Sequence, residues 1–157
     1  MMNNQPDWLP ELVRLKDYEG KWGTYVEVLY EIFRKDFKDS RPQFRSSDVA
    51  CQTNPLHQGK EPAFWHLIQG DGAGRKPDMR RCERIGWPRA ILENANSPKI
   101  RIWETQRGKD NRWCLWYVEE YLVVLGERSS YYFLITAYPT NIDHTCQKLR
   151  KDYERSL

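Results

Sequence analysis

His66 is the residue of this sequence best suited to transfer a proton near neutral pH. It lies in the apolar stretch FWHLI at residues 64–68, which has the composition of a buried helix turn. Histidine titrates close to physiological pH and serves as general acid or general base in many active sites. A lone histidine on an apolar face is also common in protein cores, so a catalytic and a structural interpretation of His66 both stay open.

A run of basic residues follows this histidine and would supply positive charge for a phosphate. Arg75 and Lys76 end a glycine-rich segment, and three more arginines follow by residue 84. At helical spacing Arg80 and Arg84 share one face, whereas Arg81 points about 100° away. Arginine can bind two phosphate oxygens with its planar fork, which lysine cannot do. We expect these three arginines to take part in catalysis, and the spacing does not choose among them.

Two hydroxyl groups stand at the end of an apolar, β-favouring segment. Thr136 and Tyr138 are two residues apart in LITAYP at 134–139, so they project to the same side of an extended chain. Both can donate a hydrogen bond to a phosphate oxygen. We therefore count both as catalytic candidates at the rim of a sheet. In the plainer interpretation Thr136 only favours the strand and Tyr138 is a rim aromatic.

The positive charge of the chain is concentrated in its central third. Residues 70–112 carry 11 basic and 6 acidic side chains, although the net charge of the whole chain is only +3. A local basic zone suits a polyanion such as RNA, and a solvated charged face is the alternative. Trp87 and Trp103 lie in the same zone and would stack on bases if they are exposed. The candidate RNA-binding residues are Arg75, Lys76, Trp87, Arg89 and Arg101.

The sequence contains no signal for a metal or a cofactor. His57 and His144 stand in polar contexts, and we expect both to be exposed bystanders without the H-E-x-x-H spacing of a zinc site. The glycine-rich segment at 70–74 lacks the G-K-[ST] ending of a phosphate-binding loop. No C-x-x-C pair occurs, and we expect free thiols at Cys51, Cys82, Cys114 and Cys146.

Helical spacing dominates the first part of the chain. Apolar residues recur at i, i+3 and i+4 through residues 22–37, which predicts an amphipathic helix of about four turns. A short helix is expected over 61–69, with a proline in its first turn. Asp78 can cap a third helix that runs to about Asn94 and is interrupted near residues 87–88. A short extended segment is expected around residues 49–51.

From residue 99 onward the apolar period changes from 3.6 to 2. The segments at 100–103, 113–118, 121–125 and 131–136 are rich in β-branched and aromatic residues and are joined by short turns. This pattern predicts a four-stranded antiparallel meander, followed by a last helix over 141–155. We therefore expect one α+β domain over 1–157, in which N-terminal helices (1–98) pack on a C-terminal four-stranded antiparallel sheet that is followed by a terminal helix (99–157).

The hydropathy of the chain argues against a membrane protein. No run of about 18 apolar residues is present, as a transmembrane helix would require. The N-terminal stretch MMNNQPDWLPELV lacks the basic and apolar regions of a secretory signal. We therefore expect a cytoplasmic protein that makes no membrane contact.

The order of these elements resembles the phage-type branch of the barnase/colicin/RelE-like ribonucleases, a group of bacterial and phage toxins. The resemblance covers about residues 60–140: a helix with His-Leu-Ile, a loop, a basic helix, and a meander whose last strand closes with Thr-Ala-Tyr. It implies a barnase/RelE-like α+β fold and a metal-independent endoribonuclease restrained by an antitoxin or immunity-type protein. It matches His66 to the helix histidine and Thr136 to the terminal-strand hydroxyl, with Tyr138 next to it.

The ribonuclease hypothesis has two rivals. The first is a non-catalytic module that binds RNA or protein through the basic helix at 75–89. The second is a phosphodiesterase that acts on a small nucleotide. RNA cleavage needs a base for the 2′-hydroxyl, positive charge at the phosphate and a proton for the leaving oxygen. The discriminating feature is whether His66 faces a basic cleft or the core: a ring buried among Trp65 and the strand aromatics would remove most of the support for an enzyme.

Overall fold

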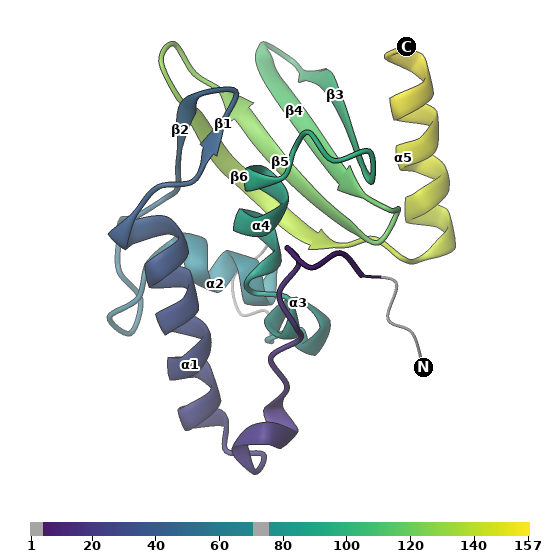
Figure 1. Ribbon diagram of the computed structural model, residues 1–157. Coiled ribbons are helices and arrows are strands. Elements are labelled where there is room, and N and C mark those ends of the chain that lie inside the picture. The colour runs from purple at the N-terminus through teal and green to yellow at the C-terminus, as the bar shows by residue number, and fades with distance from the viewer. Residues whose placement is uncertain (1–4, 71–75) are drawn as a thin grey trace.

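The computed structural model describes residues 5–70 and 76–157 and contains one mixed, six-stranded sheet (Figure 1). Its order is β1-β2-β6-β5-β4-β3, antiparallel throughout except for the parallel pair of β2 and β6. The strands are β1 (Gln43–Phe44), β2 (Ser47–Ala50), β3 (Ile100–Arg107), β4 (Asp110–Tyr117), β5 (Tyr121–Glu127) and β6 (Tyr132–Pro139).

Helices precede the meander and also follow it. They are the 3₁₀ turn η1 (Leu15–Tyr18), α1 (Trp22–Arg34), the π-helical turn η2 (Lys35–Asp39), α2 (Pro62–Gln69), α3 (Met79–Glu83), α4 (Trp87–Glu93) and α5 (Asp143–Arg155). In Figure 1 the C-terminal α5 stands apart from α1 to α4, beside β3 and β4. Within the described ranges, no helix combines the length and the apolar character needed to span a bilayer.

The structure is α+β, but the predicted four-stranded antiparallel sheet is wrong. The sheet has six strands and one parallel pairing, with helices at both ends of the chain. The last helix predicted over 141–155 forms as α5. The two additional strands form a hairpin within residues 43–50, and the extended segment expected around residues 49–51 overlaps the second of them, β2. Phe44 and Val49 are their buried residues. Strands of two and four residues are too short to show a period of 2 in the sequence.

The predicted meander from residue 99 onward forms as β3 to β6. β6 extends to Pro139, so Thr136 lies inside the strand and not at its end. Val124 of β5 pairs with Thr136, whereas the next residue of β5 pairs with Leu134, so Ile135 is an extra residue in β6. Such a β-bulge changes the direction of the side chains around it. It brings Leu134 and Ala137 to the same core, three residues apart.

Two buried clusters lie on opposite faces of the sheet. The larger cluster joins α1, α2 and α4 to the face that carries Leu115 and Val123. The smaller cluster lies between the sheet and α5 and includes Cys114 and Val124. Neighbouring residues of β4 and β5 therefore belong to different cores, as the alternation of side chains along a strand requires.

The basic segment forms two short helices, and the predicted interruption lies just before Trp87, between α3 and α4. The carboxylate of Asp78 accepts a hydrogen bond from the backbone N–H of Arg80 at 2.9 Å, which confirms the predicted cap of α3. The chain leaves the helix after Glu83 and enters α4 at Trp87. Pro88 stands in the first turn of α4, where its missing N–H removes no helical hydrogen bond.

A buried carboxylate ties α1 and η2 to the beginning of α2. Glu61 is only 1% exposed. Its Oε1 accepts a hydrogen bond from the Tyr30 hydroxyl at 2.8 Å, and its Oε2 forms an ion pair with Lys38. Burial raises the pKa of Glu61, but the hydrogen bonds from Lys38 and Tyr30 outweigh it, so this pKa lies below its usual value. The ion pair thereby fixes the N-terminal end of the helix that carries His66.

We expect Glu61→Gln to lower the free energy of unfolding by about 1–3 kcal/mol at pH 7, since it leaves Lys38 without a charged partner. Because the folded-state pKa is lowered, this contribution is present above the carboxyl's ordinary pKa and is lost as the pH falls through the folded value. Urea unfolding at pH 7 and pH 3 measures it. The matched control is Glu31→Gln in the exposed pair with Arg34, where the loss should be smaller because solvent screens both partners. Equal stability of wild type and Glu61→Gln at pH 7 would contradict the assignment.

Candidate functional site

His66 lies in a small pocket beside β6. The pocket has a volume of about 130 Å³ and is lined by Gln52, Ala63, His66, Leu67 and residues 133–136 of β6. The structure therefore brings the predicted pair His66 and Thr136 together. His66 is half-buried and its Nε2 is shielded from solvent. Since most of the lining is apolar, this pocket is closer to a core position than to a basic cleft.

Arg81 of α3 joins the same region from the other side. Its Nη1 donates to the carbonyl oxygen of His66 at 3.4 Å, and its guanidinium lies 5.4 Å from the ring centre of Tyr138. Gly70 leaves room for it, because a Cβ at that position would lie 3.1 Å from the guanidinium carbon. Four predicted site residues thus converge around β6: His66, Arg81, Thr136 and Tyr138.

The other two predicted catalytic arginines make contacts within the protein. Arg80 bonds to the side chain of Asn141. Arg84 donates to the carbonyl oxygen of Arg80 at 3.0 Å and lies 5.1 Å from the ring of Trp87. Arg80 therefore ties α3 to the segment after β6, and Arg84 lies between α3 and the first residue of α4. The basic helix offers a partner fewer cations than its sequence suggests.

The tryptophans expected to stack on bases belong to the two cores. Trp87 is 1% exposed, and its Nε1 donates to the carbonyl oxygen of Pro10 at 3.1 Å. Trp103 is 3% exposed, and its Nε1 donates to Asp152 at 2.6 Å. The expectation that these rings contact RNA is wrong, because neither ring presents a face to solvent.

The remaining RNA-binding candidates are spread over the molecule. Arg89 donates to the carbonyl oxygen of Asp36 at 2.7 Å and to the Ser40 hydroxyl at 2.8 Å, so it ties α4 to η2. Arg101 pairs with Glu119 at 2.8 Å, near the base of α5. Lys76 is exposed. Arg75 lies outside the described residues.

A larger groove lies between α5 and the sheet. Its volume is about 490 Å³, within the range of ligand pockets. Thr136 and Tyr138 both line it, as expected for side chains two apart in a strand. The sheet contributes Thr105, Gln106, Arg107, Arg112, Cys114, Leu122, Val124, Thr136 and Tyr138, and the helix contributes His144, Thr145, Lys148, Leu149, Asp152 and Arg155.

The groove combines an apolar floor with basic walls. Cys114, Leu122 and Val124 are buried side chains of the floor. The cations of the lining are Arg107, Arg112, Lys148 and Arg155, and Asp152 already accepts the hydrogen bond from Trp103. This arrangement can hold a phosphate at the walls while an apolar ring packs on the floor.

His144 is the titratable group that sequence analysis set aside. It is exposed on the first turn of α5 and lines the groove. His144, Lys148 and Asp152 are spaced i, i+4 and i+8, which places them on one face of a helix. This spacing is visible in the sequence. The sequence does not show which face of the helix packs on the sheet, because Cys146 is the one buried residue of α5.

Helix α5 is held by hydrogen bonds to Thr140, which follows β6, and to Glu119 of the β4–β5 turn. The Sγ of Cys146 donates to the carbonyl oxygen of Thr140 at 3.0 Å, and Arg150 Nε donates to Glu119 at 2.8 Å. Arg150 and then Arg101 lower the pKa of Glu119 to about 2, although partial burial opposes them. The charged pair therefore persists at any pH at which the protein would act, and it holds the helix face with His144 at the sheet.

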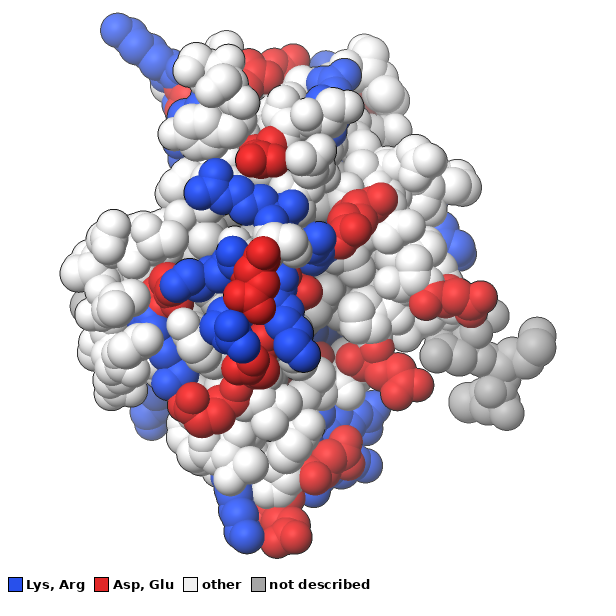
Figure 2. All heavy atoms as spheres, turned by 60° about the vertical axis from the view of Figure 1, so that its left-hand side comes forward, with Lys and Arg blue, Asp and Glu red and all other residues white. Residues whose placement is uncertain are grey.

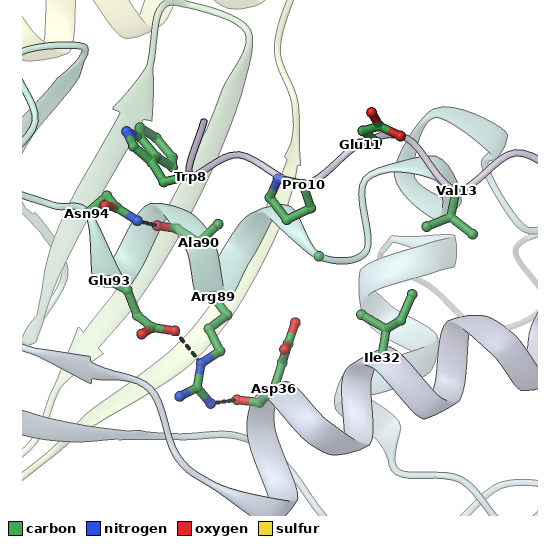
Figure 3. A pocket seen from close by; sticks show the side chains of 11 residues that line it. Trp8, Pro10, Glu11, Val13, Ile32, Asp36, Arg89, Ala90, Glu93 and Asn94 are labelled. Carbon is green, nitrogen blue, oxygen red and sulfur yellow. Dashed lines mark hydrogen bonds and ion pairs between the residues drawn. The ribbon is translucent and has the colours of Figure 1, made fainter. Parts of the chain in front are cut away.

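A third hollow, shown in Figure 3, lies on the opposite side of the sheet. It has a volume of about 470 Å³ and lies between the N-terminal segment, α1 with η2, and α4. The side chain of Asp36 points into it, and burial raises the pKa of this carboxyl to about 6 despite the nearby Arg89. Glu11 and Glu93 also line it. Three carboxyl groups make this hollow unsuitable for a polyanion.

The side of the molecule that carries α1, β1 and β2 has mixed charge. Figure 2 shows Lys and Arg side chains gathered there together with Asp and Glu. Ion pairs on these elements join Arg34 to Asp39 at 3.2 Å and Arg41 to Asp48 at 4.0 Å. The positive charge of this side is compensated, so the groove under α5 is the better anion site.

No protein-family model, curated protein or solved structure matches this chain. Among residues 5–70 and 76–157, no group of three or more His, Cys, Asp or Glu side chains is arranged to hold a metal ion.

The two histidines beside Thr136 should react differently with an acylating reagent. We expect diethyl pyrocarbonate to modify the exposed His144 readily and His66 more slowly. If His66 must open locally at a cost of about 1.4 kcal/mol, its modification slows about tenfold. Peptide mass spectrometry of the native protein over time measures both rates. His57, which is exposed, serves as an internal control. Equal rates at His66 and His144 would show that the small pocket is open to solvent.

Proposed function

We propose that the protein is a metal-independent endoribonuclease that cleaves RNA by attack of the 2′-hydroxyl on the adjacent phosphate. One observation carries the proposal: the groove under α5 gathers a histidine, basic side chains and two hydroxyl groups over an apolar floor. These are the group types that this reaction needs. The resemblance to the barnase/colicin/RelE-like ribonucleases supports the same activity.

The basic walls would stabilise the charge that builds up on the phosphate. Negative charge increases on the non-bridging oxygens as the 2′-oxygen attacks, and preorganised donors lower the barrier most effectively. Arg112 and Lys148 reach the groove from the sheet and from α5 respectively. Thr136 and Tyr138 add hydroxyl donors from β6. We assign phosphate binding to these four side chains.

Proton transfer falls to His144 in this proposal. An exposed imidazole at the groove can accept the 2′-hydroxyl proton or protonate the leaving 5′-oxygen. His66 lines the adjoining pocket and its Nε2 is shielded from solvent. We therefore assign to His66 the positioning of β6 around Thr136. The substrate would be cytoplasmic RNA, and the toxin character implied by the resemblance calls for an antitoxin or immunity-type partner.

The proposal is tested by cleavage of RNA oligonucleotides in excess chelator. We expect cleavage to continue and to leave 2′,3′-cyclic phosphate ends, which mass spectrometry of the products detects. His144→Gln should lower the rate on the order of 10²-fold, the usual value of a general acid or base. His57→Gln removes an exposed histidine outside the groove and should change nothing. His66→Gln should lower the rate less than His144→Gln does.

Other outcomes would replace the proposal. Salt-dependent binding of RNA without cleavage would favour a non-catalytic RNA-binding module. Hydrolysis of small cyclic nucleotides without cleavage of RNA would favour a phosphodiesterase. Activity that is lost in chelator and restored by magnesium would exclude the metal-independent mechanism. A loss in His66→Gln that exceeds the loss in His144→Gln, with melting temperatures unchanged, would return the proton-transfer role to His66.

A further inference from the structure

Arg128 lies across the sheet at the end of the groove under α5. It follows β5 in sequence, and its guanidinium packs over the backbone at Gly126. A Cβ at Gly126 would meet Arg128 Nη1 at 2.6 Å and its Cζ at 3.1 Å. No side chain larger than hydrogen can occupy position 126 while Arg128 keeps this place. The φ angle of Gly126 is not positive, so its backbone conformation does not require glycine. An alanine there would instead force the end of the Arg128 side chain to shift.

Asp110 holds Arg128 beside Arg112. The Oδ1 of Asp110 pairs with Arg128 Nη1 at 3.1 Å, and its Oδ2 pairs with Arg112 Nε at 2.8 Å. The hydrogen bond from Arg112 and the charge of Arg128 lower the pKa of Asp110. One carboxylate thus orients two guanidinium groups, and the trio keeps a net positive charge. Arg112 lines the groove, so Arg128 is the next cation along the same face.

The strand register places these groups in one row. Arg112 of β4 pairs with Gly126 of β5, and Gly126 pairs with Phe133 of β6. The guanidinium of Arg128 lies 5.7 Å from the ring centre of Phe133. It therefore fills the position between Arg112 and Phe133 that a side chain of residue 126 would otherwise occupy. The neighbouring row, with Cys114, Val124 and Thr136, is the floor of the groove.

We propose that Arg128, oriented by Asp110 across Gly126, binds a second backbone phosphate of an RNA strand, one nucleotide away from the phosphate held in the groove. This inference rests on the proposed ribonuclease activity and deepens it. A site with two phosphate-binding positions selects a polymer over a mononucleotide or an isolated dinucleotide. A bridge that only stabilised the β-sheet would not require the guanidinium to lie next to the groove.

The test compares a minimal substrate that has one phosphate with substrates extended by one further phosphate on the 5′ or the 3′ side. For the wild type, one of the two extensions should raise kcat/KM about tenfold, the size expected of one charge-assisted hydrogen bond. Arg128→Ala should remove most of this gain. Gly126→Ala keeps the charge but displaces the guanidinium, and it should also reduce the gain. The control is Arg14→Ala, which removes an exposed arginine directly before η1 and should leave the gain in kcat/KM unchanged.

The readout is the ratio of kcat/KM between extended and minimal substrates, with melting temperatures as the check on folding. The same ratio in Arg128→Ala and in the wild type would overturn the second phosphate site while leaving the ribonuclease proposal intact. If the wild type cleaves no RNA, the binding of 2′-O-methyl oligonucleotides still decides the inference. Arg128→Ala should then reduce the magnitude of the slope of log affinity against log salt by about 0.7, whereas Arg14→Ala should leave it unchanged. An equal reduction in both variants would show an unspecific contact and overturn the inference.

Discussion

The arrangement of the molecule depends on how β6 is hydrogen-bonded along its two edges. One edge pairs with β5 from Tyr121 to Glu127, whereas the other pairs with β2 only at Tyr132 and Phe133. Beyond these two residues the second edge is bordered by α2 and α3 rather than by another strand. Thr136 consequently lies at the boundary between the pocket of His66 and the groove under α5. The bulge at Ile135 lets β6 border both cavities. It turns Thr136 and Tyr138 toward α5, while Leu134 and Ala137 stay in the core.

The sequence predicts the local structure well and the long-range pairing poorly. The change of period at residue 99 predicts the meander, and the cap at Asp78 is confirmed by its hydrogen bond. The four-stranded sheet is wrong because the prediction does not join the extended segment near residue 49 to β6. That pairing connects residues about eighty positions apart, Val49 and Tyr132. The strands β1 and β2 have too few side chains to define a face. Parallel neighbours leave no turn signal between them, so nothing local in the sequence announces such a pair.

The candidate site is only partly predictable from the sequence, because local spacing is predictable and tertiary contacts are not. Side chains two apart in a strand must share a face, which is why Thr136 and Tyr138 line one groove. Which helix closes that groove is a tertiary property. α5 is a mostly polar helix with one buried cysteine, so its pattern does not show that His144 and Lys148 face the sheet. Sequence analysis favours His66 because an apolar helix with a histidine is conspicuous, but the same apolar surroundings shield its Nε2 from solvent.

The basic zone shows why a surplus of charge in a sequence window is weak evidence for a binding surface. Arg80, Arg84, Arg89 and Arg101 all belong to that window, and each is engaged by a carbonyl oxygen, an amide or a carboxylate of the protein itself. A guanidinium that is already paired inside the fold offers less to a phosphate, since the internal bond must be exchanged for the new one. The basic side chains that line the groove come from β3 and β4, namely Arg107 and Arg112, and from α5, namely Lys148 and Arg155. Ion pairs with carboxylates occur on both sides, at Arg34 and Arg41 near α1 and at Arg112 under α5. Under α5 the basic side chains also adjoin a histidine and two hydroxyl groups, which the proposed reaction needs. Under the proposed function, Arg112 and Arg128 would exchange part of their contact with Asp110 for a phosphate, and the groove under α5 is where such basic side chains lie next to groups that can move a proton.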